Sequence, residues 1–351
     1  MKRLILIILS ACLLLAVYAC SSVSATTDPL PPYSEPESYA AIQRNPEQTE
    51  ILLEDDGLWT IGPVTVDENG NIYVVSRFLH DRNTQDFELE IQKIDGRNEP
   101  YSLIKGLDNV IGLSAAGNKL YIFEQREHGG LWEYHMLTYS LYGELLENRV
   151  VEFGELLNPV FYYAHVFQDV PVAIFLSVKE SSGPRDENDM PPYIYNLDSG
   201  ELKAIDIFLE QGYQYYGLRP LPDGRIIAHK GRYVGGALAP GIQYHTISVN
   251  ADMSLTAQDA PEGFLEISSF ATTDMSTGNT YALLGGDGRD TEIYLITDDG
   301  LTRHVLSVPY SMGDFFFARD GFWHIVNRQL YIAVTDRFEG INKIVTLGIP
   351  D

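Results

Sequence analysis

A short pattern that repeats six times restricts the fold of this chain more than any other feature. Its clearest copy is residues 64–76, where two apolar runs flank the polar turn DENGN at residues 67–71. Gly and Asn adopt the left-handed backbone angles that tight hairpin turns require, and the residues IYVV after the turn are favoured in strands. The segment therefore predicts a β-hairpin.

The second strand of this hairpin recurs along the chain. The aligned copies are NIYVVSR from residue 71, KLYIFEQR from 119, VAIFLSVK from 172, RIIAHKGR from 225, NTYALLGG from 279 and QLYIAVTDR from 329. Their third residues are separated by 48, 53, 53, 54 and 50 positions, which is the period of propeller blades. The copies are apolar on both faces, as strands between two neighbouring sheets are. The chain is predicted to be all-β, a six-bladed β-propeller with four-stranded antiparallel blades.

The last repeat provides only three strand-like segments before the sequence ends, at residues 322–326, 329–335 and 342–349. The run TEILLE at residues 49–54 is also strand-like and precedes the first repeat. We expect this N-terminal strand to complete the last blade and close the ring, because closure removes exposed sheet edges. The fourth strand of the second blade is expected at residues 149–153.

The first nineteen residues have the layout of a secretory signal. Two basic residues precede an apolar run at residues 4–17, and a small residue precedes Cys20. The letters VYAC at residues 17–20 resemble the lipobox of bacterial lipoproteins. That resemblance implies that residues 1–19 are a lipoprotein signal peptide and that Cys20 is the lipidated residue, which anchors the protein to a membrane.

Two alternatives to this assignment stay open. The letters LSAC at residues 9–12 also fit a lipobox, although a cut there leaves a very short apolar core for export. In the second alternative the leader is not cleaved and anchors the chain in the membrane, although its apolar run is short for a helix that spans a bilayer. The lipoprotein and anchor assignments both place the domain outside the cytoplasm, at a cell surface or on the periplasmic side of a membrane.

Composition narrows the function further. Residues 20–48 are rich in Ser, Thr and Pro and predict a disordered tether, followed by the propeller domain at residues 49–351. Both cysteines lie in the leader, so the folded domain has no disulfide. Acidic residues outnumber basic ones 49 to 24, which excludes nucleic acid as a partner because such binding needs a basic face.

The hairpin segments DENGNIYVV, AAGNKLYIF and PDGRIIAH resemble the repeats of six-bladed propellers of the NHL and TolB-like type, found in many bacterial surface lipoproteins. The resemblance covers about residues 49–350. Its letters are those of turns and strands, so it implies the fold and a surface location rather than an activity.

One cation follows each second strand and provides the candidate ligand site. Three of these cations are followed by an aromatic residue. The set is Arg77 with Phe78, Arg126, Lys179, Arg232 with Tyr233, Arg289, and Arg337 with Phe338. Loops at this position face one side of the disc, and a ring of guanidinium groups there suits an anionic small molecule, a sugar, a peptide or a protein partner. The alternative is that these cations pair with the many carboxylates in the same loops.

No motif predicts a catalytic residue, a cofactor or a metal. The eight histidines occur singly, without HxxxH or HExxH, and no GxSxG sequence is present. The long segments at residues 179–192 and 231–241 are expected to be loops, where binding residues often lie. We therefore predict an extracytoplasmic, lipid-anchored propeller that acts as a ligand-binding or protein-interaction module without catalysis.

The alternative function is a hydrolase or lyase that acts on an extracellular polysaccharide or lactone at the channel mouth. It requires carboxylates or histidines that converge in the channel. A structural role in a membrane-associated complex is a third possibility.

Overall fold

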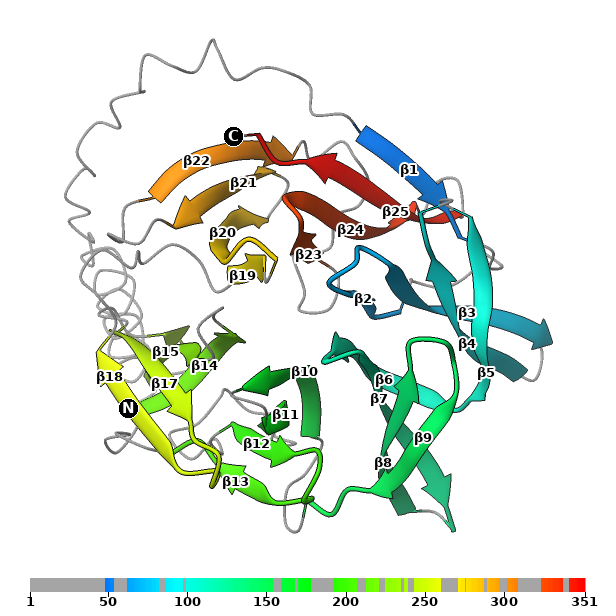
Figure 1. Ribbon diagram of the computed structural model, residues 1–351, viewed down its shortest axis with the longest axis horizontal. Helices are drawn as coiled ribbons and strands as arrows, with labels where there is room; N and C mark the ends of the chain where they lie inside the picture. The colour runs from blue at the N-terminus through cyan, green and yellow to red at the C-terminus, as the bar shows by residue number, and fades with distance from the viewer. Residues whose placement is uncertain are drawn as a thin grey trace, which may run out of the picture. The chain divides into compact units, whose positions relative to one another are not determined.

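The apolar runs of the repeats form antiparallel strands, and in the computed structural model the described strands make six sheets around a ring (Figure 1). The chain divides into two units, residues 1–45 and 46–351, and all described residues lie in the second. Backbone is described for residues 48–53, 62–81, 86–96, 99–129, 131–153, 159–167, 170–177, 192–206, 213–220, 225–234, 237–238, 243–259, 271–274, 276–286, 289–296, 302–308, 323–336 and 341–350. The predicted signal peptide, Cys20 and nearly all of the tether lie outside these residues.

Each sheet corresponds to one repeat and is called a blade. Blade 1 contains β2 (Val64–Val66), β3 (Ile72–Asp81), β4 (Asp86–Ile94) and β5 (Pro100–Leu107). Blade 2 contains β6 (Asn109–Ala116), β7 (Lys119–His128), β8 (Leu131–Ser140) and β9 (Leu145–Val150). Blade 3 contains β10 (Pro159–Phe167), β11 (Val170–Ser177), β12 (Tyr193–Asn196) and β13 (Leu202–Ala204).

The second half of the chain repeats this order. Blade 4 contains β14 (Tyr213–Pro220), β15 (Arg225–Val234), β17 (Gln243–Val249) and β18 (Leu255–Asp259), with the short β16 (Ala237–Leu238) paired to β15. Blade 5 contains β19 (Ala271–Asp274), β20 (Asn279–Gly286), β21 (Arg289–Ile296) and β22 (Thr302–Val308). Within the described part of the chain, no helix has the length and apolar character needed to cross a bilayer.

Blade 6 is assembled from both ends of the folded unit, as the sequence predicts. Its own repeat provides β23 (Trp323–Val326), β24 (Gln329–Asp336) and β25 (Ile341–Gly348). The fourth strand is β1 (Gln48–Leu52), which pairs antiparallel with β25 and sets Ile51 opposite Ile344. The prediction that an N-terminal strand closes the ring is confirmed.

Side chains of the inner strands hydrogen-bond to the backbone of the next blade. Thr65 Oγ1 in blade 1 accepts the Ala115 N–H of blade 2 at 3.0 Å. Ser114 Oγ donates to the Ala164 carbonyl of blade 3 at 3.0 Å, and His324 Nε2 of blade 6 donates to the Val64 carbonyl at 2.7 Å. These bonds satisfy polar groups that the blade contacts would otherwise bury unpaired.

A second set of links joins the outer parts of consecutive blades. Lys93 Nζ donates to the Leu141 carbonyl at 3.1 Å, Arg149 Nη1 to Leu197 at 2.9 Å and Lys203 Nζ to Met253 at 2.9 Å. Donor and acceptor are separated by 48, 48 and 50 residues, which is one repeat. Each cation therefore holds the outer turn of the next blade.

The blade 5–6 contact depends on a buried carboxylate, Asp274. Asp274 accepts the backbone N–H groups of Asn327 at 3.1 Å and Arg328 at 2.8 Å. Those two residues form the β23–β24 turn with φ of +52° and +59°, angles that cost a non-glycine residue free energy. Asp274 therefore stabilises a strained turn in the neighbouring blade.

Three local predictions differ from the structure. Strand β9 runs from Leu145 to Val150 and not over residues 149–153, because a tight turn with Gly143 at φ +86° begins it earlier. Several second strands are longer than predicted, and β15 extends to Val234. Part of the predicted loop at residues 231–241 is thus a hairpin of β15 and β16.

Candidate functional site

Four of the six predicted cations lie at the ends of strands rather than in loops. Arg77 and Arg126 belong to the second strands β3 and β7, Arg232 belongs to β15, and Arg289 begins β21. Because second strands pair further than the repeat pattern indicated, the placement of these four in loops is wrong. The described residues do not include Lys179, Arg337 or Phe338, or the side chains of Arg232, Tyr233 and Arg289. Ligand binding by this set stays a prediction.

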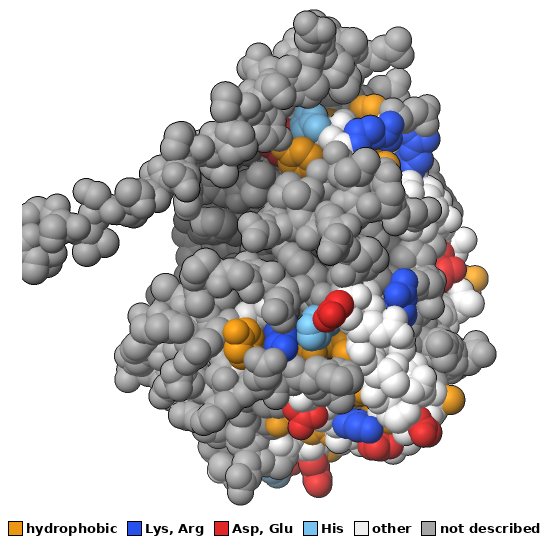
Figure 2. Space-filling view, turned by 90° about the vertical axis from the view of Figure 1, so that its left-hand side faces the viewer, with side chains coloured by type: hydrophobic (Ala, Val, Ile, Leu, Met, Phe, Trp, Pro, Cys, Tyr) orange, Lys and Arg blue, Asp and Glu red, His pale blue; other side chains and the backbone are white. Residues whose placement is uncertain are grey.

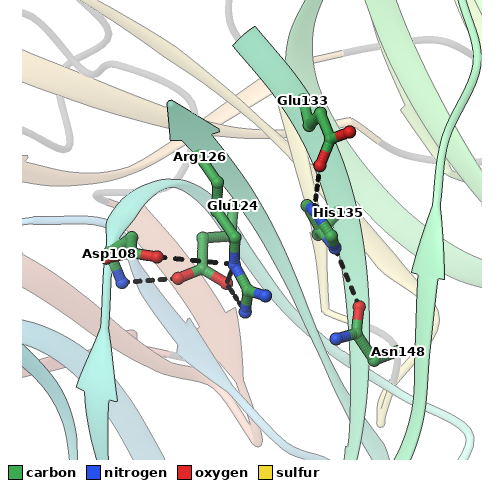
Figure 3. Close-up of polar contacts among 6 residues, drawn as sticks. All are labelled: Asp108, Glu124, Arg126, Glu133, His135 and Asn148. Atoms are coloured by element: carbon green, nitrogen blue, oxygen red, sulfur yellow. Dashed lines mark hydrogen bonds and ion pairs between the residues drawn. The ribbon is translucent and has the colours of Figure 1, made fainter. Parts of the chain in front are cut away.

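Arg126 lies in a cluster with two carboxylates between blades 1 and 2 (Figure 3). Its Nη2 donates to Glu124 Oε2 at 2.7 Å, and its Nε lies 3.5 Å from Asp108 Oδ2. The Asp108 backbone N–H donates to the other Glu124 oxygen at 2.5 Å. Glu124 has no exposed surface, whereas the side chains of Arg126 and Asp108 are 34% and 68% exposed.

Strand alternation explains the position of this cluster. In β7, Leu120 and Ile122 pack into the core between blades 1 and 2, and Glu124 and Arg126 follow on the same face. In β3, Tyr73 and Val75 face the same interface from blade 1, so alternation also directs Arg77 toward it. The structure therefore brings Arg77 and Arg126 to one blade contact.

A histidine lies beside this cluster on the neighbouring strand. His135 of β8 is directly opposite Glu124 in the β7–β8 register and is buried. Its Nδ1 lies 2.9 Å from Asn148 Oδ1, and its Nε2 lies 3.5 Å from Glu133 Oε2 (Figure 3). In this orientation of the Asn148 amide its oxygen accepts from Nδ1–H. Among the described residues, Nε2 has no hydrogen-bond partner.

The charges of these residues do not favour an anion at blade 2. The Arg126 guanidinium has two carboxylates within 3.5 Å, those of Glu124 and Asp108. The formal sum of these three groups is −1, from two negative charges and one positive. Arg126 pairs with acidic neighbours, which is the alternative that the sequence left open.

A second buried polar group, which the sequence analysis did not predict, faces the contact between blades 3 and 4. The Tyr215 hydroxyl and His245 Nδ1 share a hydrogen bond at 2.9 Å, and His245 Nε2 lies 3.4 Å from Asp259 Oδ1. Burial, and then the charge of Lys230, lower the pKa of His245. Burial raises the pKa of Tyr215 to about 12. The flank that carries β17 and β18 shows imidazole, acidic and basic side chains side by side (Figure 2).

Glu124 and His135 are the site residues that sequence reasoning missed. A signal for Glu124 was present, because KLYIFEQR carries a Glu at a position where four other copies have Ser, Leu or Val. A charged residue on an otherwise buried strand face is a sign of a paired or functional group. Nothing in the sequence joined it to His135, which depends on the β7–β8 register. Among the described residues, no three His, Cys, Asp or Glu side chains gather as metal ligands.

Comparison with known proteins bears on the fold. No protein-family model matches the chain. A search of curated proteins finds no match either. Among solved structures, a protein of unknown function from Dyadobacter fermentans has a TM-score of 0.51 at 10% identity, over 86% of this chain and 98% of that one. This chain, with its six sheets around a ring, has the fold of a β-propeller.

Two further similar structures have lower TM-scores. The periplasmic gluconolactonase PpgL of Pseudomonas aeruginosa has a TM-score of 0.40 at 16% identity, covering 82% of this propeller and 86% of that chain. The polysaccharide lyase Uly1 has 0.45 at 12% identity, covering 82% and 77%. Likeness at this level is too low to bear on the activity of this propeller.

Proposed function

We propose that this propeller is an extracytoplasmic, lipid-anchored binding module without catalysis, and that its ligand contacts the cluster of Asp108, Glu124 and Arg126. The observation that supports this is the combination of a fully buried carboxylate with partly exposed partners. The buried Glu124 carboxylate accepts hydrogen bonds from the Arg126 guanidinium and from the Asp108 backbone N–H. The polar groups that reach solvent are therefore held in place before a ligand binds. Such preorganisation reduces the entropic cost of binding.

The charges of the cluster narrow the ligand class. The sequence allows an anionic small molecule, a sugar, a peptide or a protein partner. The exposed carboxylate of Asp108 accepts hydrogen bonds, and the Arg126 guanidinium is already paired with two carboxylates. A neutral, hydroxyl-rich sugar or a peptide with basic side chains therefore fits these residues better than an acidic ligand.

The membrane anchor is proposed from the leader, through lipidation of Cys20. Replacing Cys20 with Ser removes the acceptor of the lipid, so the protein is expected to move from the membrane fraction to the soluble fraction. Fractionation of cells that express each form measures this. Equal membrane retention of both forms contradicts the lipoprotein proposal.

A hydrolase or lyase that acts on a polysaccharide or lactone is the second candidate. The observation that favours it is His135, whose Nδ1 lies 2.9 Å from Asn148 Oδ1 and whose Nε2 lies 3.5 Å from the Glu133 carboxylate. An imidazole oriented by two polar neighbours is suited to proton transfer. Its burial argues for a structural role, because a substrate must reach the nitrogen.

A thermal-shift screen of the chain against neutral, basic and acidic sugars and peptides tests the binding proposal. A ligand at one hundred times its Kd adds about 2.7 kcal/mol to the free energy of unfolding. We expect a neutral or basic compound to raise the Tm, Asp108→Asn to reduce the rise, and the control Glu201→Gln, an exposed turn residue of blade 3, to preserve it.

An acidic ligand whose stabilisation survives Asp108→Asn would place the site elsewhere. Each stabilising compound is then assayed for turnover. Turnover that His135→Gln abolishes while the thermal shift persists would favour the enzyme over the binding module.

A further inference from the structure

Strand β9, the outermost strand of blade 2, is an exposed and apolar sheet edge. Among the described strands it pairs with β8 alone. Leu146 and Val150 are each 50% exposed, and Tyr142, in the turn before β9, is 89% exposed. Sheet edges of this kind present unpaired backbone groups next to apolar side chains, so they accept strands from other chains.

The outer strands of blades 3 and 4 are less suited to pairing with a strand of another chain. In blade 3, β13 has only three residues, and in blade 4, β18 has the polar sequence LTAQD. The flank that carries β18 shows described apolar side chains only in small groups (Figure 2). In Figure 1, β9 lies on the other side of the ring. The described outer strands of blades 3 and 4 therefore offer no apolar edge of this length.

The backbone of β9 has groups directed away from its own sheet. The Val151 N–H donates inward to the Tyr134 carbonyl at 2.8 Å. Because inward and outward groups alternate along an antiparallel strand, the N–H and C=O groups of Asn148 and Val150 point outward. A strand laid against this edge would hydrogen-bond to those residues.

The sequence of β9, LLENRV, is complementary to itself in one antiparallel register. Pairing centred on Glu147 would oppose two glutamates, and pairing centred on Arg149 would oppose two arginines. Pairing centred on Asn148 sets Glu147 opposite Arg149 of the second copy. Like charges directly opposite each other destabilise a strand pair, and opposite charges stabilise it, so the charges select the register centred on Asn148.

The same register also pairs the apolar residues. Leu146 lies at a bulge of the β8–β9 pair, where the register shifts between Glu147 and Leu145. The register centred on Asn148 brings Leu146 next to Val150 of the second copy, and the reverse contact follows from the two-fold symmetry. Within one chain, Arg149 Nη2 already lies 2.5 Å from Glu147 Oε1. Two copies thus form an alternating cluster of four charges whose formal sum is zero.

We propose that two copies of this chain associate through antiparallel pairing of their β9 strands, centred on Asn148. The contact is small, because one strand and its flanking turn form it, so a dissociation constant on the order of micromolar is expected. The net charge of −25 opposes association. At about 0.15 M salt the Debye length is about 8 Å, which screens distant charges but leaves direct pairs.

Sedimentation of the full chain at roughly micromolar to 100 µM concentration, in about 0.15 M salt and mild detergent, tests this proposal. The chain carries Cys20→Ser, so that no lipid drives association. We expect the mass to double as concentration rises. Leu146→Asp and Val150→Lys are each expected to be monomeric, because each buries an unpaired charge. An equimolar mixture of the two is expected to form dimers, since Asp and Lys then face each other.

The control variant is Leu52→Asp, which changes an equally exposed leucine on the edge strand β1 and should leave the dimer unchanged. A chain that stays monomeric throughout overturns the proposal and leaves the edge to a strand of a different protein. A dimer that survives Leu146→Asp also overturns it, because association then uses another surface. Failure of the mixture to recover dimers excludes the register centred on Asn148.

Discussion

Ring closure by β1 can be tested with two neighbouring residues that differ in burial. Ile51 is 4% exposed and packs in the core between blades 6 and 1, with Ile344 and Val64. Leu52, the next residue, is 57% exposed. Truncation of both to Ala in separate variants removes similar apolar volume from the same strand, so their difference reports burial.

The expected magnitude follows from the packing that each truncation removes. An Ile→Ala change in a core costs about 2–5 kcal/mol, from the transfer free energy of the deleted atoms and the cavity left behind. In a domain of this size, 1 kcal/mol corresponds to about 2 °C in Tm. Ile51→Ala should therefore lower the Tm by about 4–10 °C, while Leu52→Ala, as a surface change, should stay within about 0.5 kcal/mol of the parent protein.

Denaturant unfolding followed by tryptophan fluorescence measures both variants. A single transition in Ile51→Ala, shifted to lower denaturant with the same slope, is the expected result, because opening of the ring weakens the whole cooperative unit. Equal midpoints for Ile51→Ala and Leu52→Ala would refute the argument that β1 closes the ring. An early, separate transition would show that blade 6 opens by itself.

Three further predictions concern individual blade contacts. A Cβ at Gly112 would lie 2.2–2.6 Å from the Phe161 side chain, so Gly112→Ala should reduce the free energy of unfolding by about 1–3 kcal/mol through overpacking. In the control Gly96→Ala the added Cβ meets nothing within 4 Å, so its thermal melt should be nearly unchanged. Burial alone would raise the pKa of Asp274, but hydrogen bonds from Ser276 and the Arg328 N–H outweigh it and lower that pKa; its stabilisation is thus present above pH about 4 and lost at lower pH. Asp274→Asn should cost about 1–3 kcal/mol at pH 7, with a difference from the parent protein that shrinks in denaturant titrations below pH 4. Because the pKa of His245 is lowered in the folded protein, the unfolded chain binds a proton there more readily. The free energy of unfolding should therefore fall as the pH drops below about 6.5. His245→Gln should reduce this dependence of stability on pH, as measured by thermal melts between pH 5 and 8.

The fold was predictable because its signals are local. Hairpin turns, strands apolar on both faces and a repeat near 50 residues are all visible in NIYVVSR and its copies, and each blade packs only on its neighbours. Even the contribution of β1 could be predicted, since a blade that lacks one strand leaves an open edge. Strand ends were predicted less well, as at β9, because turn geometry and pairing decide where a ladder stops.

The candidate site was predictable only in part. A cation near the end of each second strand could be read from the sequence, but its partner could not. Arg126 pairs with Glu124 two residues away, and with Asp108 across the turn from the preceding blade.

The sequence by itself determined the hairpins and the strand faces, because these depend on neighbours within about ten residues, and it determined the repeat because the same hairpin recurs. Tertiary structure decided which side chains meet. His135 lies opposite Glu124 through the β7–β8 register, and Asp274, in the preceding blade, accepts the Arg328 N–H. Pairs of this kind depend on register and on the packing of one blade against the next, and a shift of one residue would send each side chain to the opposite face of its sheet.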